Sequence, residues 1–251
     1  MILLVDIGNS RLKYASLEDG SPKFIGSHDY YASPIDADSI QIADRVPDAI
    51  YQISVADESI EHELDLMCQQ RWGLQPYKLT AEGDCSGVTN GYIPPESLGV
   101  DRWAAMIGAY HLINDAVVVV DCGTACTIDI INSSGLHSGG AIIPGYQMMQ
   151  QALKRGTARI KPAAASGVSH VPGVTTADCL HYGAIEASCG LVERVTQWAE
   201  NESGKAVTVV VTGGGALQLL PHLHRPVHYE RNLVFLGMKA MVAEKLKGVS
   251  R

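Results

Sequence analysis

Two segments of the chain, residues 3–14 and 118–129, share one pattern of apolar and polar positions. Each starts with a continuous apolar run, breaks at Asp-x-Gly plus a small polar residue, and continues as a second strand-like run. The offset from Asp6 to Asp121 is 115 residues. Because the turn chemistry repeats with the hydrophobicity, the pattern predicts a duplicated lobe, although a match this short also arises between unrelated strand–turn–strand units.

The rest of the chain alternates between strand-like and helical patterns. Strands are predicted at 49–56, 116–120 and 206–211, and helices at 58–72, 101–113, 146–155, 177–201 and 233–247. Strands joined by hairpins and then alternating with helices are typical of mixed α/β lobes, not of one parallel doubly wound sheet. The segment 162–172, rich in Ala, Ser and Gly, is predicted to be a mobile loop.

Composition narrows the class of protein. The 251 residues, 46% hydrophobic and 18% charged, predict a soluble globular protein of one large domain or two small ones. The net charge of −8 argues against a nucleic-acid partner, because phosphate backbones bind clustered Lys and Arg. An anionic small-molecule substrate is compatible with this charge, since a helix end, a metal ion or one Arg can make the electrostatic potential inside a cleft positive.

Nothing along the chain predicts export or a membrane span. Only Met1 to Val5 precede Asp6, and no apolar run approaches membrane-spanning length, so a cytoplasmic protein is expected. The six cysteines form no CxxC pair and are expected to be reduced and mostly buried. Cys122 and Cys126, in an extended strand, would lie about 13 Å apart on one face. A metal site there is not favoured.

The two Asp-x-Gly turns are the first candidates for chemistry. In Asp6-Ile-Gly-Asn-Ser10, Gly8 would allow a tight turn whose amides face a phosphate. An ordinary hairpin with locally satisfied polar groups is the alternative. The second copy, from Asp121 to Thr124, favours the interpretation that these turns bind phosphate. Two facing hairpins can hold a polyphosphate while their aspartates hold hydrated Mg²⁺ or a monovalent cation. No GxxxxGK[ST] phosphate loop is present.

A glycine-rich turn follows the last predicted strand. Thr212-Gly-Gly-Gly215 places bare backbone after the apolar run 207–211. Glycines there would let a nucleobase or ribose approach the main chain. A flexible turn is the alternative.

The order of these motifs resembles the superfamily of actin, heat-shock chaperones and sugar kinases. Within it, Gly99-Val-Asp-Arg102 matches the GxDR motif of the type III pantothenate kinases. The segment 139–145 matches their GGxIxPG motif, and 232–237 resembles their C-terminal segment. The resemblance covers the chain from Asp6 to Gly237, with the motifs in the family's order.

The resemblance implies an α/β fold of two duplicated actin-like (ribonuclease H-like) lobes, with mixed sheets flanked by helices and a cleft between the lobes. Residues 1–114 would form the first lobe and 115–235 the second, and helix 236–251 would pack back toward the first. The implied activity is ATP-dependent phosphorylation of the primary hydroxyl of pantothenate to 4′-phosphopantothenate, the first step of coenzyme A synthesis, by a homodimer.

The resemblance also implies a catalytic residue. Asp101 would be the base that accepts the hydroxyl proton of pantothenate, in keeping with a loose phosphoryl-transfer transition state that needs the alcohol positioned. A helix N-cap is the alternative for this aspartate. Arg102 would pair with polar or anionic groups of the substrate, with a surface ion pair as its alternative.

Further substrate contacts are implied at Tyr92, Gly99 and Val100. Thr176 would reach the site of the neighbouring subunit; its alternative role is the N-cap of the following helix.

On the nucleotide side, the resemblance places a run of residues and one threonine around the ATP phosphates: Asp6, Ile7, Gly8, Asn9, Ser10, Arg11, Leu12, Lys13 and Thr124. Gly213 and Gly214 would contact the nucleotide. Asp121 would hold a monovalent cation, K⁺ or NH₄⁺, and Asp6 would hold Mg²⁺ through water. Strand alternation also allows Lys13 to be a solvated side chain, and a structural role suits Asp129 equally well.

Two other functions fit this superfamily. One is another small-molecule kinase acting on a sugar, although such relatives are commonly longer. The other is a non-catalytic transcription-accessory protein on the same scaffold. The intact site residues argue against it: Asp6, Asp101, Arg102 and Asp121.

Overall fold

The structure, a computed structural model, describes residues 1–42, 45–157 and 172–249. Within them the chain forms two compact units. The first contains residues 1–114, 135–137 and the chain from 232 onward, and the second contains 115–134 and 138–231. The predicted loop at 162–172 lies, except for Pro172, outside the described residues.

The first unit is built on a five-stranded mixed sheet with the order β3-β2-β1-β4-β5. β1 pairs antiparallel with β2 and parallel with β4. A separate two-stranded sheet joins β6 and β7. The strands are β1 (Ile2–Ile7), β2 (Leu12–Glu18), β3 (Ser21–His28), β4 (Ala49–Ser54), β5 (Tyr77–Lys78), β6 (Asp84–Cys85) and β7 (Val88–Thr89).

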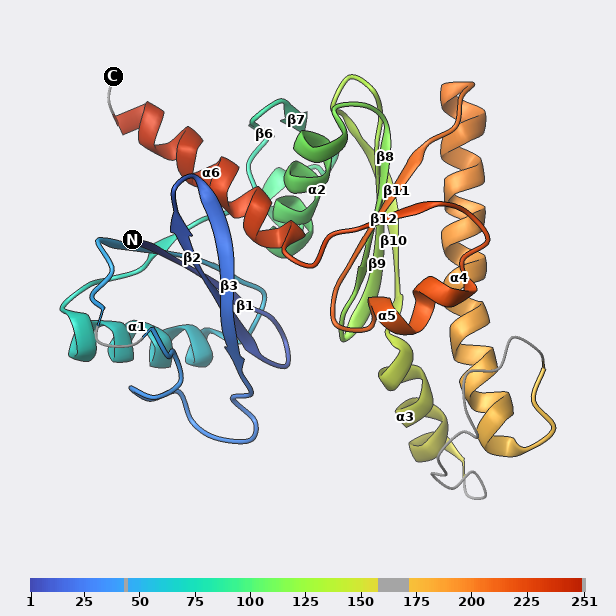
Figure 1. Cartoon of the computed structure of the whole chain (residues 1–251), viewed down its shortest axis with the longest axis horizontal. Coiled ribbons are helices and arrows are strands. Elements are labelled where there is room, and N and C mark those ends of the chain that lie inside the picture. Colours follow the sequence, from blue (N-terminus) through green and yellow to red (C-terminus); the bar gives the residue numbers. More distant parts are fainter. Residues whose placement is uncertain (43–44, 158–171, 250–251) are drawn as a thin grey trace. The chain divides into compact units, whose positions relative to one another are not determined.

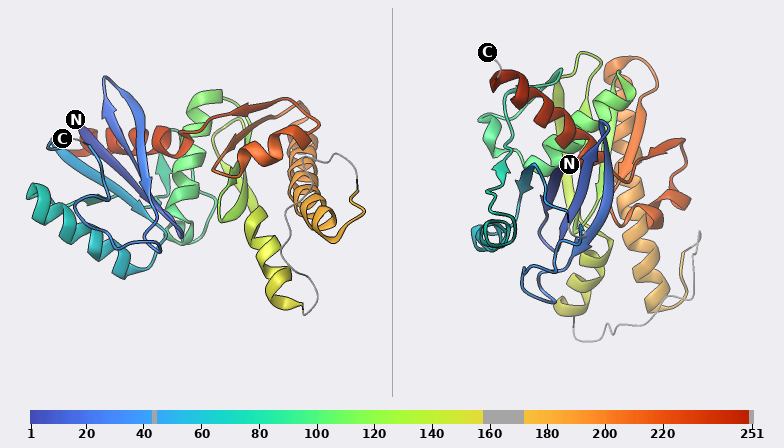
Figure 2. Two further views of the ribbon diagram at one scale, coloured as in Figure 1. Left: turned by 60° about the horizontal axis from the view of Figure 1, so that its bottom comes forward. Right: turned by 60° about the vertical axis from the view of Figure 1, so that its left-hand side comes forward.

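Helix α1 (Glu58–Trp72) covers one face of this sheet (Figure 2). Its start is capped by the Asp57 side chain, which accepts a hydrogen bond from the amide of Ser59. It ends at Gly73 in the left-handed conformation, which glycine adopts at little cost. Leu64 is fully buried on its inner side, in one cluster with Leu3 and its neighbours on β1.

The opposite face of the sheet is covered by α2 (Val100–Ile113) and α6 (Leu233–Val249), which pack against each other. The short helix η1 (Pro95–Ser97) precedes α2. The close contact between α2 and α6 occurs at two glycines: a Cβ at Gly108 would overlap the carbonyl of Leu233, and one at Gly237 would overlap the carbonyl of Ala104. This contact fixes α2 against α6 over the stretch from Ala104 to Gly108.

The second unit repeats the first in topology. Its sheet has the order β10-β9-β8-β11-β12, with β8 antiparallel to β9 and parallel to β11. The strands are β8 (Val117–Cys122), β9 (Ala125–Ile131), β10 (His137–Pro144), β11 (Thr208–Thr212) and β12 (Val227–Tyr229). The matching strand order confirms the duplicated lobes predicted from the sequence. The turns differ in length, with four residues between β1 and β2 and two between β8 and β9.

The long helix α4 (Thr176–Ser203) packs on one face of this second sheet (Figure 1). Ile185, Cys189 and Val192 on the helix are buried in one cluster with the valines of β8 and β11. α5 (Ala216–Leu219) and η2 (Leu220–His222) follow β11. Every side chain of α3 (Tyr146–Gly156), by contrast, is at least partly exposed.

The helices follow the sequence pattern closely, whereas six strands were not predicted: β3, β5, β6, β7, β10 and β12. The helix predicted at 58–72 has the bounds of α1, and the other predicted helices differ from the structure by one or two residues at their ends. β3 and β10 were not predicted, since their exposure alternates along polar and glycine-rich sequences that lack an apolar run. Among the described residues, none of the helices combines the length and apolar character needed to cross a bilayer.

Candidate functional site

The turn after β1 closes through the backbone. The amide of Gly8 donates to the carbonyl of Arg11 at 3.1 Å, and the Tyr30 hydroxyl donates to the carbonyl of Gly8. Burial raises the pKa of Tyr30 to about 12, so this donor keeps its proton. A Cβ at Gly8 would meet only the Arg11 oxygen, at an ordinary 3.5 Å. Neither the space nor the backbone conformation at position 8 by itself requires a glycine, so the binding of a phosphate by this turn stays a prediction.

Asp6 and Lys13 form an ion pair across the first hairpin. They face each other in the β1–β2 register, and Lys13 Nζ lies 3.2 Å from Asp6 Oδ2. The Asp6 side chain is only 5% exposed, whereas that of Lys13 is 36% exposed. A buried carboxylate needs a cationic partner. Lys13 is therefore partly solvated, as strand alternation allowed, and still bonded to Asp6.

Asp101 lies in the first turn of α2. The N-cap of this helix is Gly99, so the N-cap alternative for Asp101 is wrong. Its Oδ1 atom accepts a hydrogen bond from the Arg102 amide at 2.7 Å, and a Cβ at Gly99 would come within 2.8 Å of that oxygen. The GxDR motif therefore places a glycine where it leaves room for the carboxylate.

The pKa of Asp101 is raised above its ordinary value. Burial is the largest cause and the charge of Asp6 the second, while the Arg102 amide and the cations of Arg102 and Lys13 act in the opposite direction. The structure thus brings two of the predicted acidic residues, Asp6 and Asp101, into one electrostatic group. Raised carboxyl pKa values are typical of groups that take up protons near neutral pH.

Arg102 turns inward. It is 7% exposed, and its Nη1 donates to the Tyr92 hydroxyl at 3.0 Å with the guanidinium carbon 5.4 Å from the centre of the tyrosine ring. The alternative of a surface ion pair is therefore wrong. The backbone at Tyr92 is held by Asn90, whose Oδ1 accepts the Tyr92 amide at 2.9 Å. Nothing in the sequence singled out Asn90. Its burial and its hydrogen bonds are visible only in the structure.

In the second unit, the glycine-rich turn packs on the second Asp-x-Gly turn. Gly213 has φ +92°, and a Cβ there would overlap Asp121 Oδ1 and lie 2.6 Å from the backbone of Cys122. The Gly215 amide donates to the Cys122 carbonyl at 2.8 Å. A Cβ at Gly214, in contrast, would meet no described atom within 4 Å. The turn is therefore anchored at 213 and 215 and open at 214.

The end of β10 also packs on this turn. The Gly145 amide donates to the Thr124 carbonyl at 2.9 Å, and a Cβ at Gly145 would come within 2.6 Å of that oxygen. The last glycine of the GGxIxPG motif therefore allows the chain to cross close to Thr124. Asp129, on β9, is 2% exposed and has electrostatic or hydrogen-bonding contacts within the fold.

Cys122 and Cys126 lie opposite each other across the β8–β9 hairpin, not 13 Å apart along one strand as expected. The hydrogen bond between the two thiols raises the pKa of Cys122, as burial does, and lowers that of Cys126 against the opposite effect of burial. All six cysteines fall in the described residues and are free thiols, five of them buried. No group of three or more metal-ligating His, Cys, Asp or Glu residues occurs in the part of the chain that the structure describes.

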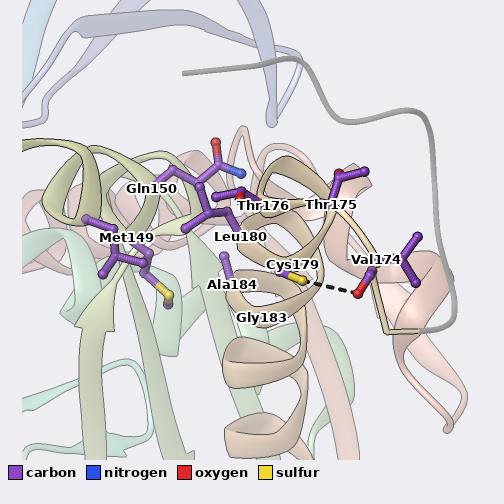
Figure 3. Close-up of a pocket in the computed structure, with 11 residues that line it drawn as sticks. Met149, Gln150, Val174, Thr175, Thr176, Cys179, Leu180, Gly183 and Ala184 are labelled. Carbon is purple, nitrogen blue, oxygen red and sulfur yellow. Dashed lines mark hydrogen bonds between the residues drawn. The ribbon is translucent and has the colours of Figure 1, made fainter. Parts of the chain in front are cut away.

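Thr176 is the first residue of α4, and Thr175 is the N-cap, so the capping role considered for Thr176 is wrong. Thr176 lines a pocket of about 560 Å³ between α3 and the start of α4 (Figure 3). Met149 and Leu180 contribute to its apolar wall. The structure places Thr176 in the second unit, whereas Tyr92, Gly99, Val100 and Asp101 belong to the first.

Comparison with known proteins agrees with this arrangement. The chain is 10% identical to an activator of 2-hydroxyisocaproyl-CoA dehydratase from Clostridium difficile, solved with bound ADPNP, at a TM-score of 0.51 over 100% of this chain and 97% of that one. A structure from Campylobacter jejuni, described as a conserved Baf family transcriptional activator, is 25% identical at a TM-score of 0.60, covering 98% and 99%. The protein thus has the α/β fold of two duplicated actin-like lobes with mixed sheets flanked by helices.

A sequence profile of the type III pantothenate kinases matches residues 2–198. A type III pantothenate kinase from Nitrosococcus oceani is 32% identical over 258 aligned positions, covering 100% of this chain and 97% of that relative. The chain belongs to the type III pantothenate kinase family.

Proposed function

We propose that the protein transfers the γ-phosphoryl group of ATP to the primary hydroxyl of pantothenate, giving 4′-phosphopantothenate for coenzyme A synthesis. The observation that carries this proposal is the group formed by Asp6, Asp101, Arg102 and Tyr92 in the first unit. It combines a carboxylate of raised pKa with a buried cation and a phenol. Phosphorylation of an alcohol calls for a carboxylate that takes the hydroxyl proton, and an anionic end on the same substrate calls for a cation that binds it.

Asp101 acts as the base. As the hydroxyl oxygen bonds to the γ-phosphorus, its proton passes to the Asp101 carboxylate, and the bond from the γ-phosphorus to the β–γ bridging oxygen breaks to release ADP. The pKa raised by burial and by Asp6 makes the carboxylate a better proton acceptor than an exposed aspartate. The hydrogen bond from the Arg102 amide holds one carboxylate oxygen in place.

Arg102 and Tyr92 recognise the polar part of pantothenate, together with Gly99 and Val100. The Arg102 guanidinium is desolvated, so an ionic contact with a substrate anion would be stronger there than at the surface. Its bond to the Tyr92 hydroxyl fixes the direction in which the remaining N–H groups can donate.

The two Asp-x-Gly turns bind the nucleotide. Residues 6–13 and Thr124 take the phosphates, and the open backbone at Gly214, next to the anchored Gly213, accepts a flat part of ATP. The carboxylates Asp6 and Asp121 suit hard cations. Asp121 would hold K⁺ or NH₄⁺, and Asp6 would hold Mg²⁺ through water. These cations neutralise phosphate charge when bound.

A coupled assay of ADP release tests the activity and its cation together. With MgATP and K⁺ we expect turnover with pantothenate and none above background with hexoses. Replacing K⁺ by Na⁺ should lower the rate, because the larger K⁺ sheds its water more readily for protein oxygens. Equal rates in Na⁺ would remove the cation site from the proposal, and turnover with hexoses alone would favour a sugar kinase.

The two alternative functions are weaker. The family profile and the relative from Nitrosococcus oceani are both type III pantothenate kinases, whereas the likeness to a transcriptional activator comes from one structure's description. A non-catalytic protein would have no use for a buried Asp101 of raised pKa, which costs folding free energy.

The enzyme is proposed to act as a homodimer in which Thr176 reaches the partner's site. The apolar pocket beside Thr176, which the exposed side chains of Leu153 and Val174 help to line, supports a covered surface on α3 and the start of α4. Light scattering should give twice the 26.9 kDa chain mass, and Leu153→Glu should halve it. A monomeric wild type would contradict the proposal.

The cytoplasm is the proposed location. ATP is plentiful there, and the free thiols, five of them buried, suit a reducing compartment.

A further inference from the structure

The ring of His137 stacks on the ring of Tyr92. The ring centres lie 5.7 Å apart and the planes differ by 8°, which is an offset parallel arrangement. His137 is 3% exposed, so its side of the stack is shielded from water, whereas Tyr92 is partly exposed. Neither the motifs nor the proposed mechanism assigns this histidine a role, although it touches a proposed substrate-binding residue.

The chain around His137 is locked to the chain around Tyr92. The Thr89 amide donates to the Gly135 carbonyl at 2.9 Å, and Thr89 and Leu136 form a parallel β-bridge. A Cβ at Gly91 would overlap the carbonyl of His137. Residues 135–137 therefore belong to the first unit, although β9 before them and the rest of β10 after His137 belong to the second.

The Tyr92 ring in turn contacts Arg102. A rotation of the ring away from His137 would move the phenol oxygen that accepts the Arg102 hydrogen bond, 3.0 Å long, and would shift the ring that faces the guanidinium. The backbone of Tyr92 is already fixed by Asn90. The torsions of the tyrosine side chain are the freedom that remains, and the imidazole ring restricts them.

We propose that His137 is a positioning residue of the kinase: it holds the Tyr92 ring, and through it the Arg102 guanidinium, in the orientation that binds pantothenate. This inference rests on the proposed substrate roles of Tyr92 and Arg102. Because the stack acts on binding of the acceptor and not on the nucleotide turns, its loss affects the KM for pantothenate and leaves the KM for ATP unchanged.

The test compares three variants of the full-length enzyme by steady-state kinetics. His137→Leu, which keeps the apolar volume without an aromatic face, should raise the KM for pantothenate about 3- to 10-fold, the range that an aromatic pair contributes. The KM for ATP should stay within about twofold of wild type. His137→Phe should restore the KM for pantothenate, because a benzene ring can stack as the imidazole does. His111→Leu, on exposed α2 surface and bonded to the Ser86 carbonyl, is the control.

A double variant separates positioning from general destabilisation. In a Tyr92→Leu background, His137→Leu should cause no further rise in the KM for pantothenate. Equal rises in both KM values, additive effects in the double variant, or no rescue by phenylalanine would overturn the inference. If Tyr92→Leu and Arg102→Ala themselves leave the KM for pantothenate unchanged, the proposed substrate site is wrong and the inference falls with it. If Tyr92→Leu and Arg102→Ala raise the KM for pantothenate and His137→Leu does not, only the inference about His137 fails.

Discussion

Asp101→Asn is expected to reduce phosphoryl transfer to pantothenate about 100- to 10,000-fold, the contribution of a positioned general base. The amide has nearly the shape of the carboxylate but cannot accept the hydroxyl proton. Its oxygen can still accept the hydrogen bond that the Arg102 amide now gives to Oδ1. Binding of ATP, measured by calorimetry, should therefore change little.

The same change should leave the protein as stable as wild type or more stable at neutral pH. The native pKa of Asp101 is raised by burial and by Asp6, so ionisation of this group costs folding free energy at any pH above that native pKa. The cost disappears as the pH falls through the native pKa toward the unfolded value. Asparagine carries no charge and avoids the cost, so the thermal midpoint should be equal or higher.

The pH–rate profile gives a second measurement. Because the base must be ionised, kcat/KM should fall at acidic pH. The apparent pKa of this acidic limb should lie above the ordinary aspartate pKa of about 3.9. Asp115→Asn is the matched control, since this exposed carboxylate pairs with Lys205 and has a lowered pKa. It should keep full activity and gain no stability. Near-normal turnover in folded Asp101→Asn would refute the assignment of the base.

Gly237→Ala is expected to have the largest effect on stability. The added Cβ would overlap the carbonyl of Ala104 and come within 2.5 Å of its carbon, so backbone and not a flexible side chain must move. Such overpacking costs about 3 kcal/mol or more when nothing can rotate away. For a chain of this length the thermal midpoint should fall by about 6–12 °C, as measured by circular dichroism.

Loss of the contact between α2 and α6 should also lower the activity. α6 packs against α2, and α2 begins beside Asp101, so any separation of the helices moves the proposed base. Gly248→Ala, in the same helix with no described atom within 4 Å of its Cβ, is the control. It should be neutral or slightly stabilising, because alanine favours a helix over glycine. A variant at 237 as stable as this control would contradict the packing argument.

The sequence alone determined the fold class and most helices, and it singled out the residues of the proposed site. Helices such as α1 carry their own signals, with an aspartate that caps the start and a glycine that ends the last turn. The repeat of Asp6 and Asp121 was visible because a buried strand followed by a polar turn is a local pattern. The GxDR motif placed Asp101, since neighbouring residues on a helix keep their spacing whatever surrounds them.

The tertiary structure decided what these residues touch. Burial and the charge of Asp6 raise the pKa of Asp101, and the hydrogen bond from Arg102 to Tyr92 depends on a loop held by Asn90. His137 follows Tyr92 by 45 positions and meets it only because three residues of one strand connection pack on the first unit. Burial and contacts between distant segments arise from packing of the whole chain, and no local pattern of residues encodes them.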